Sequence, residues 1–178
     1  IWATGTQRPQ FGGQSSASLM EHWDGTQWTV IPSPSPGSAT NGFSSLTVVS
    51  STSVWAVGGT SNWSSPVQTL IAHWDGSQWT VIPSPNAGVT DILNAAVAIG
   101  NKNIWAVGYY EEDNPPYQTL ILHWTGTKWN IVSSPNSGFD SNFLDAVTRV
   151  PRTTSIWTFG SHFDPGTGQE GSLSLFRC

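Results

Sequence analysis

The stretch Val54-Trp55-Ala56-Val57-Gly58 decides the fold of this chain, because it returns three more times. The other copies are Ile1 to Gly5, Ile104 to Gly108 and Ile156 to Gly160, and their tryptophans lie 53, 50 and 52 residues apart. Flat and β-branched side chains fit pleated sheets, whereas glycine interrupts them, so each copy is predicted to be a short strand. The chain is therefore an array of units of about 50 residues.

A second motif predicts a hairpin in each of the first three units. In the second unit it reads His73-Trp74-Asp75-Gly76-Ser77-Gln78-Trp79, and its equivalents begin at His22 and His123. The Asp-Gly and Thr-Gly pairs favour a hairpin turn because glycine supplies the positive φ that a tight reversal requires. Each full unit then divides into four short strands, which in the second unit are residues 46–50, 54–58, 69–74 and 79–82.

Four antiparallel strands in about 50 residues are typical of a β-propeller blade. Solenoid repeats of about 20–29 residues are too short, and helical repeats need an apolar period of about 3.6 residues that no segment shows. The predicted fold class is all-β, a propeller of four-stranded antiparallel blades, with about three and a half blades in this chain. The expected divisions are a partial blade at 1–36 (strands two to four), blades at 43–86 and 92–136, and a partial blade at 143–178 (strands one to three).

The two end blades are expected to be incomplete, the first without its first strand and the last without its fourth. Unpaired strand edges favour association with other chains. The sequence is therefore interpreted as a processed or partial piece of a longer protein. Its ring would be completed by further chain or by self-association with a second copy.

The composition excludes several classes of protein. The 178 residues include 11 tryptophans, 18 glycines, 12 prolines and one cysteine, and only 10% of them are charged. A single cysteine, Cys178, excludes an internal disulfide and a cysteine metal cluster, and no apolar stretch approaches the ~20 residues of a membrane helix. The net charge of −5 argues against a phosphate backbone as ligand, so we expect neither nucleic acid binding nor membrane insertion.

The units resemble the blades of Kelch-type propellers. Each has an apolar second strand that ends in glycine, doubled in Gly58-Gly59, and a hairpin bracketed by an aromatic residue and a tryptophan, such as Trp74 and Trp79. The usual Kelch tyrosine is replaced by tryptophan here. The units look closer still to tryptophan-rich propeller repeats of secreted or surface proteins of soil bacteria. This resemblance implies a propeller and a secreted or cell-surface location, but no ligand, since propellers include enzymes, lectins and scaffolds.

Most repeated side chains are interpreted as packing residues. Trp55, Trp105 and Trp157 lie in apolar runs and are expected to be buried between blades. His22 and its equivalents belong to third strands, away from the central channel, and are too far apart to share zinc at a Zn–N distance of ~2.0–2.1 Å. Each histidine ring is expected to bond to the backbone of its own blade.

Carboxylates are few, and no nucleophile, base and orienting group occur together. Glycoside hydrolysis needs two carboxylates ~5–10 Å apart, which only Glu111, Glu112 and Asp113 with acids of the last unit could supply. The same run is a weak candidate for a calcium site, because Ca²⁺ prefers oxygen ligands. We therefore expect a protein that is not an enzyme and has no cofactor, a propeller-fold glycosidase or lyase being the less favoured interpretation.

The loops divide the predicted propeller into two faces. Connections between strands one and two and between strands three and four are short and uniform, whereas the others, such as 60–68 and 110–118, are long and divergent. The long loops carry aromatic and amide side chains that packing does not obviously require. The candidate ligand-binding residues on this face are Phe11, Trp63, Tyr109, Tyr110, Tyr117, Gln118 and Phe163.

Exposed rings beside planar amides suit sugar recognition, and they suit protein recognition equally well. The rings could equally pack down on their own loops. Trp63 is the only tryptophan without a counterpart in another unit, which makes it the best single lead. The predicted function is a non-catalytic extracellular binding module for a glycan or protein ligand. The alternative is a structural or assembly propeller.

Overall fold

The computed structural model describes residues 1–8, 15–112, 116–136, 141–164 and 166–177. These residues form fourteen strands in four antiparallel sheets and no helix. Blade one contains β1 (Trp2–Gln7), β2 (Ala17–Trp23) and β3 (Trp28–Val30). Blade two contains β4 (Thr40–Ser50), β5 (Ser53–Ser61), β6 (Gln68–Trp74) and β7 (Trp79–Val81). Blade three contains β8 (Thr90–Gly100), β9 (Asn103–Glu111), β10 (Gln118–Trp124) and β11 (Trp129–Ile131). Blade four contains β12 (Ser141–Arg149), β13 (Ile156–Asp164) and β14 (Gln169–Arg177).

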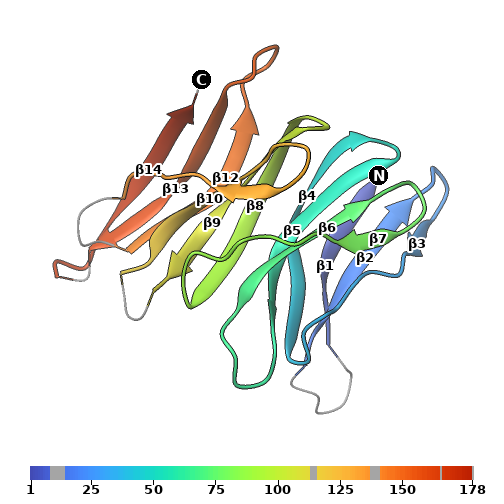
Figure 1. Cartoon of the computed structure of the whole chain (residues 1–178), viewed down its shortest axis with the longest axis horizontal. Helices are drawn as coiled ribbons and strands as arrows, with labels where there is room; N and C mark the ends of the chain where they lie inside the picture. Colours follow the sequence, from blue (N-terminus) through green and yellow to red (C-terminus); the bar gives the residue numbers. More distant parts are fainter. Residues whose placement is uncertain (9–14, 113–115, 137–140, 165, 178) are drawn as a thin grey trace.

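The sheets follow one another across the molecule, from blade one at the N-terminus to blade four at the C-terminus (Figure 1). Within each sheet the strands pair in chain order, three, four, four and three strands to a blade. The all-β propeller class and the blade count of about three and a half are therefore confirmed. Figure 1 also shows the short turns at the upper edge of the sheets and the long loops at the lower edge. No helix in the described part of the chain is long and apolar enough to cross a membrane.

The first strands of the blades are longer than predicted, because each contains a β-bulge. β4 begins at Thr40, six residues before the predicted start, and its register with β5 shifts between Phe43 and Ser45. A bulge breaks the alternation of apolar and polar residues, so the strand before it leaves little signal in the sequence. The same shift occurs in β8 between Leu93 and Ala95.

The bulge explains why the repeated motif ends in glycine. In blade three it brings the backbone of β8 against Gly108, where an added Cβ would overlap the carbonyl oxygen of Ile92. Gly58 and Gly160 are in the same position against β4 and β12. These glycines are therefore required by close approach of two backbones.

The hydrophobic cores lie between successive blades. The Trp55 side chain of blade two is 3% exposed, and its ring centroid lies 4.9 Å from Trp124 and 5.7 Å from Trp129 of blade three. Trp2 of blade one contacts Trp74 and Trp79 of blade two in the same way, at 5.0 and 5.4 Å. The second-strand tryptophans of blades one and two thus pack on the hairpin tryptophans of the next blade.

Two expectations about repeated residues were wrong. Trp157 is 38% exposed rather than buried, because within the described residues no further blade covers its face. His73 and His123 bond to side chains rather than to the backbone: His73 Nε2 lies 3.0 Å from Ser53 Oγ, and His123 Nε2 lies 2.9 Å from Asn103 Oδ1. The register pairs His73 with Trp55, so the two ring centroids lie 4.4 Å apart, with the ring planes tilted by 36°. Ser53 lies two residues before Trp55 on the same strand. Burial lowers the pKa of His73 below its usual 6.5, so the ring is neutral at pH 7.

Candidate functional site

Three of the aromatic candidates of the long-loop face pack between blades. Tyr109 and Tyr117 pack edge to face at 5.5 Å, and both contact Phe143 of blade four, at 5.0 and 5.4 Å. Burial raises the pKa of Tyr109 above its usual 10.0. Tyr110 packs against the core between blades two and three. These three tyrosines are therefore largely used in joining neighbouring blades.

Two candidates present their rings to solvent on different blades. Trp63 is 53% exposed on the β5–β6 loop, and Phe163 is 38% exposed on β13. Gln118 begins β10, is half-buried and pairs with Tyr110 of β9. Phe11 and Asp113 lie outside the described residues. The predicted residues therefore do not form one cluster, and Trp63 is the most exposed aromatic among those described.

A network of hydrogen bonds holds the loop that carries Trp63. The Oδ1 of Asn62 accepts hydrogen bonds from the N–H and the hydroxyl of Ser38, at 2.9 and 3.2 Å. The N–H of Ser65 donates to the carbonyl of Asn62 at 3.1 Å, and Ser64 has a positive φ of 63°. The tip is thus a tight turn tied to the segment that enters blade two, and the indole is presented from a fixed backbone.

A cavity of about 160 Å³ adjoins this turn. Asn62 and Ser65, on either side of the Trp63-Ser64 tip, line it together with Thr60, Gln68 and the backbone at Gly37. All its described lining residues are uncharged. A second cavity of about 360 Å³ lies on the other side of the 37–38 segment, lined by residues that include Arg8, Ser16 and Asn41. The sequence signal for the first cavity was the long and divergent loop 60–68, which supplies most of its lining.

A buried acid anchors the corresponding segment of the next blade. Asp91 is fully buried, and its carboxylate accepts hydrogen bonds from the N–H groups of Ala87, at 2.6 Å, and Gly88, at 3.2 Å. Burial raises the pKa of this carboxyl above its usual 3.8, and the hydrogen bonds oppose the shift only in part. Blades two and four have asparagine here, Asn41 and Asn142, both buried. The position therefore requires a short polar side chain but not its charge.

We expect Asp91→Asn to gain stability relative to the wild type as the pH rises above 3.8. Because the folded-state pKa is raised, the unfolded chain loses its proton first, so the wild type loses stability between 3.8 and the folded-state pKa. Urea unfolding of both proteins at about pH 3 and pH 7 measures the difference. Acids whose pKa values are lowered, such as Asp24, are present in both proteins, so their effect on stability cancels in the comparison. If the stability of Asp91→Asn relative to the wild type stays constant or falls as the pH rises, the pKa of Asp91 is not raised in the folded protein.

The weak metal candidates do not form a site in the described part of the chain. Glu111 ends β9 and Glu112 is exposed in the loop after it. Across the described ranges, no three His, Cys, Asp or Glu side chains are grouped so that they could hold a metal ion.

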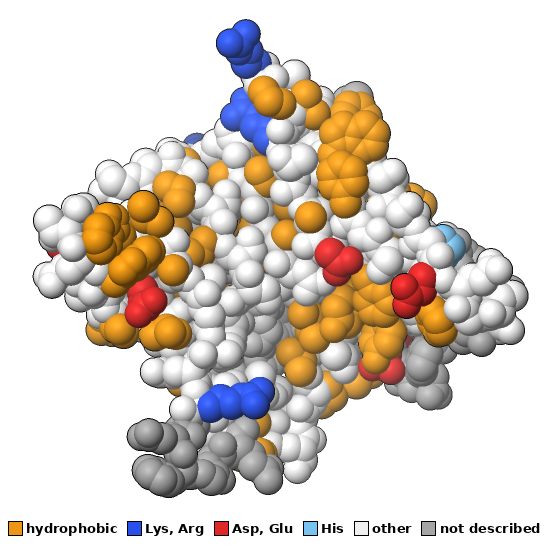
Figure 2. Space-filling view, turned by 180° about the vertical axis from the view of Figure 1, so that it is seen from behind, with side chains coloured by type: hydrophobic (Ala, Val, Ile, Leu, Met, Phe, Trp, Pro, Cys, Tyr) orange, Lys and Arg blue, Asp and Glu red, His pale blue; other side chains and the backbone are white. Residues whose placement is uncertain are grey.

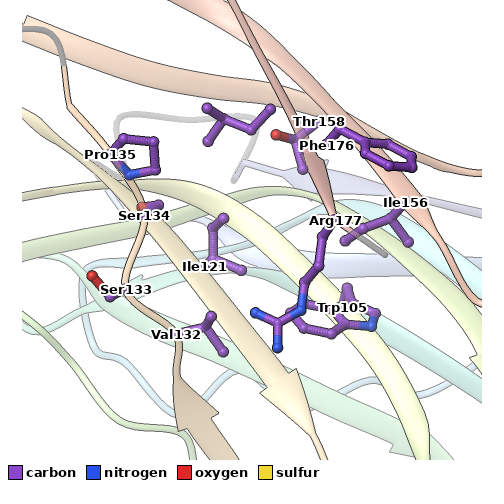
Figure 3. Close-up of a pocket in the computed structure, with 11 residues that line it drawn as sticks. Trp105, Ile121, Val132, Ser133, Ser134, Pro135, Ile156, Thr158, Phe176 and Arg177 are labelled. Atoms are coloured by element: carbon purple, nitrogen blue, oxygen red, sulfur yellow. The ribbon is translucent and has the colours of Figure 1, made fainter.

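A groove between blades three and four is a second candidate surface, which sequence reasoning missed. It encloses about 140 Å³ and is lined from blade three by Trp105, Ile121 and the segment 132–135. Blade four contributes residues of β13 and β14, including Arg177 (Figure 3). The guanidinium carbon of Arg177 lies 4.6 Å from the ring centroid of Trp105, which is a cation–π contact. The sequence feature that could have predicted this groove is Arg177, which occupies a repeat position where the other units have tryptophan, such as Trp124.

The outward face of blade four is apolar and exposed. Trp157, Phe159 and Phe176 are 38%, 46% and 48% exposed, and both phenylalanine rings contact Trp157. The equivalent residues of blade three, Trp105 and Val107, are buried against the next blade. Figure 2 shows hydrophobic side chains gathered in separate patches, one of them on the side of blade four. Self-association through the end blades stays a prediction, for which this face offers a surface.

The fold resembles that of a solved structure described as YCF48 bound to D1 peptide. The match covers 90% of this chain and 49% of that chain, at 17% sequence identity and a TM-score of 0.49. This chain therefore spans about half the length of that structure. No protein-family model matches the sequence, and no curated protein does so either. The assignment of the repeats to the Kelch type stays a prediction.

Proposed function

We propose that the protein is a non-catalytic binding propeller whose ligand contacts the long-loop face at Trp63. The observation that carries the proposal is an indole, 53% exposed, on a hydrogen-bonded turn beside an uncharged polar cavity of about 160 Å³. A rigid aromatic anchor on a fixed backbone loses little entropy on binding. Such an anchor is expected where a propeller meets its ligand.

The chemistry around Trp63 favours a neutral carbohydrate. The indole offers a flat apolar face for sugar C–H groups. The cavity beside it is lined by the polar side chains of Asn62, Gln68 and Thr60, which also form hydrogen bonds within the protein. A charged ligand would find no countercharge among the described residues of this cavity. We propose a location outside the cell or on its surface, which the resemblance of the repeats implies and which would suit a carbohydrate ligand. A polypeptide ligand is the other outcome that the experiment distinguishes.

We expect Trp63→Ala to weaken ligand binding at least about tenfold while leaving the fold intact. Labelled protein is applied in parallel to an array of neutral oligosaccharides and to an array of peptides. Binding to the first array alone supports the carbohydrate, and binding to the second alone replaces it with a polypeptide. Titration of the best array ligand then compares the variant with the wild type.

The matched control is Trp28→Ala, which removes a second exposed indole, 47% exposed on the outer strand of blade one. This control should bind as well as the wild type. Circular dichroism checks that both variants are folded. Unchanged binding by Trp63→Ala, or an equal loss in both variants, overturns the proposal.

A further inference from the structure

The larger cavity of the long-loop face, about 360 Å³, lies between blades one and two. Blade one supplies Arg8 and the start of β2, and the segment 35–41 that leads into β4 supplies the opposite wall. Arg8 follows β1 directly, in phase with Trp2 and Thr6. Trp2 packs on the hairpin tryptophans of blade two, and Thr6 lies against Gly42. Because side chains alternate along a strand, Arg8 belongs to the face of β1 that meets blade two.

Two small residues of blade one leave this space open. Ser16 and Ala17 stand at the start of β2, where blade two has Val67 and Gln68. The Gln68 side chain reaches the next blade, where its amide donates a hydrogen bond to the carbonyl of Val89 at 2.9 Å. Alanine has no group that could make this contact. The cavity therefore follows from a difference between units at the start of the third strand.

The walls of the cavity are fixed by hydrogen bonds within the protein. Asn41 is 2% exposed, and its amide group donates to the carbonyls of Ser16, at 3.0 Å, and Gly37, at 2.6 Å. Its Oδ1 accepts a hydrogen bond from the Gly37 N–H at 2.7 Å. The hydroxyl of Ser35 accepts one from the Ser18 N–H at 3.0 Å. A ligand would thus meet a preformed wall, which lowers the entropy lost on binding.

The groups left to contact a ligand are a cation and small polar side chains. Arg8 is exposed and is the one charged residue in the described lining, and Ser15 is half-buried. Neither side chain makes a hydrogen bond with another described residue. The planar guanidinium group matches a carboxylate through two parallel hydrogen bonds, and a hydroxyl can donate to or accept from a sugar hydroxyl.

The size and lining of the cavity favour one small hydroxylated ring. Ligand pockets span about 300–1,000 Å³, so this cavity is near the lower limit. Its described lining contains no aromatic side chain, and Ala17 is its single apolar one. A flat apolar ligand would find no stacking partner there. A ligand with several hydroxyl groups and one negative charge fits the groups present.

We propose that this cavity binds a hexuronic acid, a single sugar ring with a carboxylate. The carboxylate contacts Arg8, and the ring hydroxyls face Ser15 and Gln7. The site goes beyond the proposed function, because it lies across the segment 37–38 from the cavity beside Trp63 and needs no contact with that indole.

The test is a nuclear magnetic resonance titration of the ¹⁵N-labelled 178-residue protein with glucuronate. Saturable shifts are expected for the backbone amides of Ser15, Gly37 and Ser38, which line the cavity. Glucose has the ring without the carboxylate, and acetate has the carboxylate without the ring. At constant ionic strength both should bind at least about tenfold more weakly than glucuronate.

Two variants localise the binding. Arg8→Gln removes the cation, and we expect it to weaken glucuronate binding at least about tenfold. Ala17→Gln introduces the residue of blade two and should weaken binding as strongly, because the longer side chain occupies the cavity. The dispersion of amide resonances checks that each variant is folded.

The matched control is Arg152→Gln, which makes the same charge change in the exposed β12–β13 turn, outside the cavity. This control should bind glucuronate like the wild type. Trp63→Ala should do so too, so the proposed function and this site can fail independently.

Four results would each overturn the proposal. They are no saturation at tens of millimolar glucuronate, binding of glucose or acetate as tight as that of glucuronate, equal losses in Arg8→Gln and Arg152→Gln, and unchanged binding by folded Ala17→Gln. Inorganic phosphate is added as a competitor. Displacement of glucuronate by an equal concentration of phosphate would also overturn the proposal, because the site would then select charge and not a sugar.

Discussion

Gly108→Ala is expected to lower the free energy of unfolding by about 3 kcal/mol or more. The new Cβ would overlap the carbonyl of Ile92, and it would also lie 2.9 Å from the Cα of Leu93. Both neighbours are backbone atoms of the bulged strand β8, so no side-chain rotation can relieve the overlap. The strand would have to move away from β9, which would separate the inner strands of blade three.

Gly5→Ala is the matched control, because Gly5 is the same repeat position in blade one. No described atom lies within 4 Å of the Cβ that would be added there, because blade one has no inner strand against β1 in the described sheet. We expect a change within about 1 kcal/mol of the wild type. Urea unfolding followed by far-ultraviolet circular dichroism measures both variants. Equal losses in the two would show that the glycine is not required by the bulge.

Trp55→Ala should lower the free energy of unfolding by about 3–5 kcal/mol. The indole is 3% exposed and contacts His73, Trp124 and Trp129, so its removal opens a cavity between blades two and three. Trp157→Ala makes the same substitution at the equivalent position of blade four. That ring is 38% exposed and contacts only rings of its own blade among the ring pairs described, so we expect a loss of about 1–2 kcal/mol.

The two tryptophan variants are compared by chemical unfolding under identical conditions. The difference between their losses in free energy of unfolding measures how much packing against the next blade stabilises the tryptophan at this repeat position. Near-ultraviolet circular dichroism should show the loss of aromatic coupling in Trp55→Ala and a smaller change in Trp157→Ala. If Trp157→Ala loses as much free energy of unfolding as Trp55→Ala, the exposed face of Trp157 is covered in solution.

The candidate site was only partly predictable from the sequence. Divergence between units pointed to the long loops, but it could not separate rings that face solvent from rings that join blades. Tyr109 and Tyr117 pack on Phe143, which is more than twenty residues away in the chain and belongs to the next blade. Trp63 could be singled out from the sequence, because no other unit has a tryptophan at its position and a packing role common to all units is therefore excluded.

The repeat alone was enough to predict strands, turns and blade number, because each depends on residues within one unit of about 50 residues. The turn glycines and the alternation of apolar residues act locally, and each unit repeats them. Relations between units depended on the tertiary structure. Packing of one blade against the next buries Trp55 and leaves Trp157 exposed, although the two lie in nearly the same local sequence. The same packing places Arg177 over Trp105 and leaves a groove beside them, since burial depends on the neighbouring blade and not on the motif.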